Sequence, residues 1–151
     1  LSGGVYLGGT GAANKLDDYE EGAWTPALTT NGSAPSVTYT AQVGTYTKVG
    51  RLVFVSGRLA WSAIGSYTGN FIINGLPFTI LNSSGAYSQM TSVDHAGVTF
   101  GANDTTFGGY GAVGFTNIFL IVGKNNGTAS TPISGLSTSG YIYFNLTYQQ
   151  E

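Results

Sequence analysis

The chain has 151 residues, of which only 8% are charged: five Lys and Arg against seven Asp and Glu, for a formal net charge of -2. Soluble domains typically carry ~25% charged residues, so this chain has few groups with which to face water. We therefore expect other subunits to cover part of its surface. The basic residues are scattered, and a protein that binds nucleic acid needs a basic footprint, so we expect no nucleic-acid partner.

Several further classes of protein are disfavoured by what the sequence lacks. Cysteine is absent, which excludes disulfides and thiolate metal sites. The longest unbroken apolar run covers residues 118–122, far below the ~20 residues of a membrane-spanning helix, so we expect no membrane insertion. The sequence starts at Leu1 without a signal peptide. We expect it to be a fragment of a longer polypeptide.

Residues 1–16 are rich in Gly and Ala, and residues 8–11 read Gly-Gly-Thr-Gly. A glycine-rich loop of this kind holds a phosphate only when it opens a helix behind a strand. No apolar stripe with helical spacing follows before Pro26. We therefore interpret the segment as extended and expect no nucleotide or other cofactor.

An acidic cluster marks the point where the chain changes character. Residues 17–21 contain four of the seven acidic residues, and the sequence beyond Pro26 can build a core. We predict an extended shaft or neck segment over residues 1–21 and a head domain over residues 22–151. The carboxylates lack the Asp-x-Asp-x-Asp spacing of a calcium loop, so we favour a solvated or threefold-paired cluster over a Ca²⁺ site.

From Val37 onward, apolar residues recur with a period of two, which is typical of β-strands, and no segment has a sustained helical stripe. Residues 102–116 and 123–140 are rich in Gly, Ser, Thr and Asn, and we predict loops there. Many short strands between turns predict an all-β fold, an antiparallel β-sandwich or jelly-roll-like head. The predicted strands are 37–41, 43–48, 51–61, 71–73, 78–81, 86–93, 98–101, 117–122 and 141–148.

A two-residue turn at residues 49–50 predicts a hairpin. With that turn, Tyr46 faces Val53 on one side of the strand pair. The opposite side carries Leu52 and Phe54, so it is partly apolar as well. We expect this second strand of the hairpin to be covered on both faces.

Three motifs, in this order, resemble the junction found in bacteriophage tail-fibre proteins. They cover residues 6–26, with Leu-Asp-Asp-Tyr-Glu-Glu-Gly-Ala-Trp-Thr-Pro at the end, residues 46–51, Tyr-Thr-Lys-Val-Gly-Arg, and residues 75–78, Gly-Leu-Pro-Phe. Ala23 stands where the pattern more often has Thr. In such fibres the junction joins the shaft to a C-terminal head, which resembles a trimeric β-sandwich that contacts the host surface.

The resemblance implies that the chain is the C-terminal, receptor-binding head of a tail fibre, located on the virion at the distal end of the fibre. It implies a homotrimer that attaches to a host cell-surface polysaccharide or lipopolysaccharide. A structural trimerisation cap without receptor contact is the alternative. An enzyme, such as a polysaccharide depolymerase accessory domain, would need an activated nucleophile or paired carboxylates, and we expect neither enzymatic activity nor catalytic residues.

Carbohydrate sites combine aromatic rings with polar side chains that bind hydroxyl groups. Asp94 and His95 are neighbours on a predicted strand, where adjacent side chains point to opposite faces, so they make a poor catalytic dyad. A metal held by three copies of His95 on the trimer axis is an alternative that the sequence leaves open; we expect no other metal site. The glycan-binding candidates are Trp61, Tyr67, Tyr87, Asp94, His95, Asn103, Asp104 and Tyr110.

Aromatic and apolar side chains near the junction are candidates for the contact between subunits, because such side chains bury large areas. Trp24 fits the core of its own subunit equally well, and the sequence does not decide between the two. The trimer-interface candidates are Tyr6, Leu16, Tyr19 and Trp24.

Overall fold

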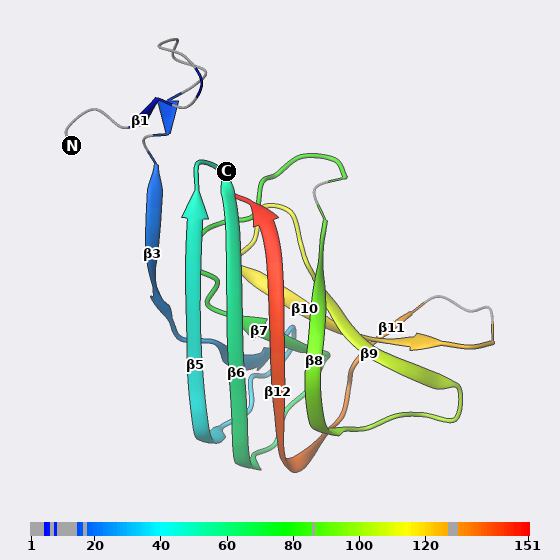
Figure 1. Ribbon diagram of the computed structural model, residues 1–151. Helices are drawn as coiled ribbons and strands as arrows, with labels where there is room; N and C mark the ends of the chain where they lie inside the picture. Colours follow the sequence, from blue (N-terminus) through cyan, green and yellow to red (C-terminus); the bar gives the residue numbers. More distant parts are fainter. Residues whose placement is uncertain (1–4, 7, 9–14, 17, 86, 127–129) are drawn as a thin grey trace.

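The structure is an all-β protein without a helix in its described residues, as Figure 1 shows, which confirms the predicted fold class. Accordingly, that part of the chain offers no helix with the length and apolar character to cross a membrane. At residues 5, 15, 16, 92 and 93 the backbone alone is described. The computed structural model describes residues 5–6, 8, 15–16, 18–85, 87–126 and 130–151.

The strands form two antiparallel sheets. β1 pairs with β2, and all the other strands belong to one main sheet. The bounds are β1 Val5–Tyr6, β2 Lys15–Leu16, β3 Tyr19–Trp24, β4 Ala27–Thr30, β5 Val37–Val49, β6 Leu52–Ile64, β7 Phe71–Asn74, β8 Ser88–Val98, β9 Asp104–Gly111, β10 Asn117–Lys124, β11 Thr131–Pro132 and β12 Leu136–Gln149. β3 crosses the domain boundary that the sequence predicts after residue 21.

The main sheet is curled. Its strand order is β3-β5-β6-β12-β8-β9-β10-β7-β4, with β11 beside β10. β3 and β4 lie at opposite ends of this order, although only Thr25 and Pro26 separate them in the chain. Three Cα steps span at most about 11 Å, so the two ends of the sheet must come together. In Figure 1, β5, β6, β12 and β8 form a front layer, and β10 and β7 pass behind it.

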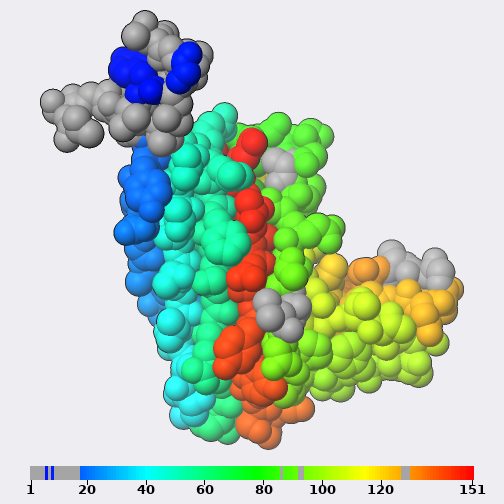
Figure 2. Space-filling model, in the orientation of Figure 1, coloured from blue at the N-terminus to red at the C-terminus, as the bar shows by residue number. Residues whose placement is uncertain are grey.

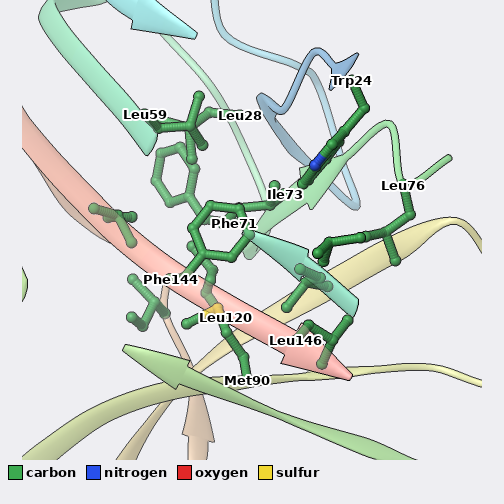
Figure 3. Close-up of a cluster of buried hydrophobic side chains, with 14 of the residues drawn as sticks. Trp24, Leu28, Leu59, Phe71, Ile73, Leu76, Met90, Leu120, Phe144 and Leu146 are labelled. Atoms are coloured by element: carbon green, nitrogen blue, oxygen red, sulfur yellow. The ribbon is translucent and has the colours of Figure 1, made fainter. Parts of the chain in front are cut away.

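The core lies between these layers (Figure 3). β12 shows how it is built: Ile142, Phe144, Leu146 and Tyr148 are buried, whereas the residues between them are more exposed. Each large apolar side chain removed from water contributes ~1.5–3 kcal/mol relative to an exposed one. Both layers contribute to the core, through Val55 and Leu59 of β6, Phe144 and Leu146 of β12, Phe71 and Ile73 of β7, and Leu120 of β10.

The predicted hairpin exists, but its register differs from the prediction. Gly50 and Arg51 form the turn, one residue later than predicted, and Tyr46 therefore pairs with Val55 instead of Val53. Gly50 has φ +58°, a conformation that glycine adopts without steric cost, and its N–H donates to the carbonyl oxygen of Asp18 at 2.8 Å. The assignment of faces holds, because a shift of two residues keeps each side chain on its side of the sheet.

The prediction of loops over residues 102–116 and 123–140 is partly wrong. β9 lies inside residues 102–116, and its glycines are required by packing: a Cβ at Gly111 would clash with Ile80, and one at Gly109 would lie 2.8 Å from the carbonyl oxygen of Phe119. The predicted strand over residues 78–81 is absent apart from a single bridge between Ile80 and Gln150. Ile80 instead fills the space over Gly111 and is fully buried. β12 likewise begins inside the second predicted loop.

Substituting Gly57 tests the packing between the layers. A Cβ at this position would clash with the ring of Phe144, so Gly57→Ala should lower the free energy of unfolding by about 1–3 kcal/mol in a urea titration. Gly108→Ala is the control, because the nearest atom to its Cβ would be the Met90 carbonyl oxygen at 4.0 Å. The control should be neutral or stabilising by up to ~1 kcal/mol. Equal losses in both variants would contradict this account of the core.

Candidate functional site

The three sequence motifs, far apart in the chain, meet in one place. We call Asp18, Glu20, Tyr46, Lys48 and Phe78 the junction cluster. The Lys48 ammonium donates to the Asp18 carboxylate, and the Tyr46 hydroxyl donates to Glu20 at 2.5 Å. The Phe78 ring lies edge-on to Tyr46, at 5.3 Å between centroids, and its centroid is 5.4 Å from Lys48 Nζ. The cluster therefore joins β3, β5 and the segment after β7.

Lys48 is the buried charge of this cluster. It is 5% exposed, whereas the side chain of its partner Asp18 is 49% exposed. A buried ammonium group is costly unless it is paired, and here a carboxylate and the face of an aromatic ring both stabilise it. Asp18 is also held through its backbone carbonyl, which accepts from the Gly50 N–H. Asp18, the residue before β3, is thus fixed to the β5–β6 turn.

The acidic cluster has its partners within its own chain. Besides the pairs of Asp18 and Glu20 in the junction cluster, Glu21 accepts from the Tyr19 hydroxyl at 2.8 Å. These hydrogen bonds favour the protonated phenols, so Glu20 raises the pKa of Tyr46 and Glu21 raises the pKa of Tyr19. Asp17 lies outside the described residues. Within the described part of the chain, no three His, Asp or Glu side chains gather where they could hold a metal ion.

The interface candidates differ in exposure. Trp24 belongs to the core of its own chain: it is 7% exposed, its Nε1–H donates to the Ser56 carbonyl oxygen at 3.1 Å, and its ring meets Phe144 edge-on. Tyr6 and Tyr19, in contrast, are exposed. The side chain of Leu16 lies outside the described residues. The sequence allows Trp24 either at the contact between subunits or in the core of its own subunit, and in this structure it lies in the core.

The eight glycan-binding candidates do not form one site, and two of them are packing residues. Trp61 is 2% exposed, and its Nε1–H donates to the Ser137 carbonyl oxygen at 3.0 Å. Tyr67 is half-buried, with its ring centroid 4.6 Å from that of Phe71. Trp61 is therefore closed to a ligand in this structure, and Tyr67 packs against the core.

Two candidates that are distant in sequence do meet. Tyr87 and Tyr110 have ring centroids 5.8 Å apart, and Tyr110 stacks on Phe119 with an interplanar angle of 13°. Tyr110 and Phe119 are paired across β9 and β10, which sets the stack. Tyr87, at 60% exposed, ends the row. We call these three residues the aromatic row.

Asp94 and His95 lie on opposite faces of β8. Asp94 accepts from the Tyr141 hydroxyl at 3.2 Å, and its charge raises the pKa of Tyr141. The His95 ring lies between Phe107 and Phe100, at 4.8 and 5.8 Å between centroids. The carboxylate of Asp94 accepts from the His95 backbone N–H and has no contact with its imidazole.

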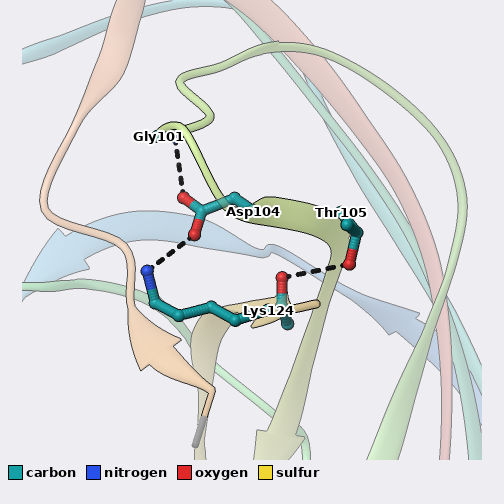
Figure 4. Close-up of polar contacts among 5 residues, drawn as sticks. Gly101, Asp104, Thr105 and Lys124 are labelled. Carbon is teal, nitrogen blue, oxygen red and sulfur yellow. Dashed lines mark hydrogen bonds and ion pairs between the residues drawn. The ribbon is translucent and has the colours of Figure 1, made fainter. Parts of the chain in front are cut away.

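β9, β10 and β11 extend from the main body as an arm, as Figure 2 shows, and Asn103 and Asp104 lie at its outer end, where β9 begins and β10 ends. The Asp104 carboxylate accepts from Lys124 Nζ at 2.8 Å and from the Gly101 N–H at 2.8 Å, as shown in Figure 4. Asn103 accepts from the Asn125 N–H through its backbone carbonyl. The hydrogen bond from Lys124, together with that from Gly101, holds the pKa of Asp104 below its usual range. Asp104 thus fastens the end of the β9–β10 ladder.

The solvent side of β3, β5, β6, β12 and β8, the front surface in Figure 2, is a broad face that we call the outer face. A row of small polar residues, Thr45, Ser56 and Asn145, crosses its middle. Of the ten exposed large apolar residues described, six lie on the outer face: Tyr19, Val43, Val49, Leu52, Phe54 and Tyr143.

Two shallow cavities on the outer face share the side chains of Arg58 and Tyr143. One, of about 240 Å³, extends over Thr45 and Ser56, and the other, of about 460 Å³, reaches Asp94. The Arg58 guanidinium lies 5.4 Å from the centroid of the Tyr143 ring. Arg58 and Tyr143 were not among the sequence candidates. The sequence feature that could have identified them is the period-two alternation of their strands, which places both side chains on the face opposite the core.

Comparison with solved structures shows one likeness in fold. The crystal structure of the Dettilon tailspike protein (gp208) superposes with a TM-score of 0.67 at 20% sequence identity. The match covers 85% of this chain and 23% of the tailspike chain, so this chain spans about a quarter of that protein's length. No family model and no curated protein matches the sequence. At this identity the likeness shows a shared fold.

Removing Asp18 tests the junction cluster. Asp18→Ala leaves the Lys48 ammonium buried without a counter-charge, so the free energy of unfolding should fall by about 1–3 kcal/mol in a urea titration. The loss should be smaller than the ~3–5 kcal/mol of a fully buried pair, because Asp18 is half exposed. Glu21→Ala, whose partner Tyr19 is exposed, is the control and should cost less than ~0.5 kcal/mol. A similar loss in both variants would argue against a special role for Lys48.

The lowered pKa of Asp104 predicts a dependence on pH. Its folded-state pKa lies below the unfolded value of ~3.9, so the stabilisation is present above that value and is lost as the pH falls through the folded-state pKa. Asp104→Asn should lower the melting temperature at pH 7, and the gap to the unmodified protein should narrow below about pH 4. Thr105→Ala, which removes the neighbouring bond to the Gly123 carbonyl oxygen, should give a gap that does not change with pH. A constant gap for Asp104→Asn would contradict the assignment.

Proposed function

We propose that this chain is the head of a phage tail protein and that it attaches the virion to the surface of the host cell. The observation that carries the proposal is the likeness in fold to a phage tailspike over 85% of the chain. The junction cluster supports it independently. The three motifs that resemble the tail-fibre junction form a single set of contacts that binds the lead-in to the head.

The proposed head is a homotrimer at the distal end of a tail fibre. Support comes from the sparse charge of the chain and from the outer face, where large apolar side chains stand in solvent on a single chain. Threefold repetition would also multiply a modest affinity per site by avidity.

The proposed ligand is a polysaccharide or lipopolysaccharide of the host surface, and we place its contact at the aromatic row. Tyr87 and Tyr110 are the two glycan candidates whose rings meet. Tyr87 is also 60% exposed, just before the start of β8. An exposed amphipathic ring supplies contact area at little cost in conformational entropy. A structural cap that aligns three chains without contacting a receptor is the second candidate function. The low charge of the chain is compatible with either function.

Adsorption of phage to host cells tests the attachment. The purified chain should compete with the phage for host cells, whereas a cap without receptor contact should not compete at any concentration. Tyr87→Ala should raise the concentration needed for half-maximal competition about fivefold or more, as the loss of an aromatic anchor typically does. Tyr87→Phe keeps the ring and should compete almost as well as the unmodified chain. If Tyr87→Ala competes as well as the unmodified chain, the ligand does not bind at the aromatic row.

A further inference from the structure

We propose that the outer face is the surface on which a second copy of this chain docks, with the strands β5, β6 and β12 at the centre of the contact. The inference rests on the proposed function, which requires a trimer but does not say which surface the subunits share. Three properties of the outer face carry it: its apolar side chains, its unmatched charges and its size.

The apolar side chains are the first property. Val43, Leu52 and Phe54 are 56%, 52% and 47% exposed, on strands whose other faces form the core. The outer face concentrates six of the ten exposed large apolar residues that the structure describes. Aliphatic side chains offer nothing to the hydroxyl groups of a sugar, whereas they are ordinary constituents of contacts between subunits. The row of Thr45, Ser56 and Asn145 supplies hydrogen-bonding groups among them.

The charges are the second property. Arg58 projects from β6 over the ring of Tyr143, and among the described residues no carboxylate forms an ion pair with it. Asp94, on β8, is exposed and accepts a hydrogen bond from the neutral Tyr141 hydroxyl. Arg58 and Asp94 line the same shallow cavity and carry opposite charges, so each can pair with its counterpart on a second copy. Such pairs set the register of a contact more than its affinity.

The size is the third property. The outer face follows its five strands over their full lengths, from the six residues of β3 to the fourteen of β12. A strand residue covers about 16 Å² of a sheet, at about 3.4 Å along the strand and about 4.8 Å between strands, so the projected area is about 900 Å². A stable interface buries about 800 Å² on each partner. The outer face is therefore large enough for the contact with a neighbouring copy.

Sedimentation tests the proposal on the chain as it stands. The unmodified chain should sediment at about 47 kDa, three times the 15.6 kDa of one copy. Phe54→Asp places a charge on the outer face, beside the row of Thr45, Ser56 and Asn145, and should sediment at 15.6 kDa. Phe115→Asp is the matched control: Phe115 is 55% exposed but lies between β9 and β10, away from the outer face, so this variant should remain a trimer.

Thiol labelling gives a second measurement that does not require a folded Phe54 variant. The chain has no cysteine, so each introduced cysteine is the only thiol. Thr45→Cys lies on the outer face and Thr106→Cys on β9, and both threonines are exposed in a single chain. In the purified protein, a maleimide should label Cys at position 45 at least tenfold more slowly than Cys at position 106.

The outcomes separate this inference from the proposed function. A monomeric unmodified chain overturns both the docking surface and the trimer. A trimer that persists in Phe54→Asp, with rapid labelling at position 45, overturns the outer face and leaves the trimer standing. Protection at position 45 that appears only when host polysaccharide is added assigns the outer face to a glycan and overturns docking of a second copy. Protection in the purified trimer supports the inference.

Discussion

The constraint on which the fold depends is the short link between the two ends of the sheet. β3 and β4 are its terminal strands, and Thr25 and Pro26 alone separate them. The sheet therefore cannot lie open. It must fold back on itself, and its two halves then lie ~10 Å apart, the distance at which stacked sheets pack. The enclosed space becomes the core, and Trp24, at the end of β3, is drawn into it. The same closure leaves the other side of β5, β6 and β12 facing outward.

The junction cluster shows why three short motifs belong together. Residues from β3, β5 and the segment after β7 surround the ammonium group of Lys48 and the ring of Phe78. These residues depend on one another, since the buried charge is paired with Asp18 and the Phe78 ring packs edge-on against Tyr46. A resemblance spread over distant parts of a sequence thus corresponds to one local set of contacts, at the place where the lead-in meets the sheet.

Much of the fold could be predicted because alternation reports which side of a strand is buried. Leu52 and Phe54 were correctly assigned to the face opposite the core, and the alternation of 141–148 is that of β12. β9 could not be predicted in this way. It contains glycines because Ile80 and β10, which are distant in sequence, pack too closely against it to leave space for a Cβ. The candidate site was predicted least well. Residue type identifies aromatic and polar side chains, but only packing decides that Trp61 is internal while Tyr87 stands in solvent.

The position of β3 has a mechanical consequence. The chain enters the main sheet at Tyr19, and from there β3 runs antiparallel to β5 over six residue pairs, Tyr19↔Val49 to Trp24↔Gly44. A force that pulls the start of β3 away from the far end of the sheet acts along these strands. Hydrogen bonds of an antiparallel ladder lie perpendicular to the strands, so the load is shared by all of them at once. The sheet therefore resists such a pull by shear along the whole β3–β5 ladder. A strand pulled sideways would instead lose its hydrogen bonds one at a time.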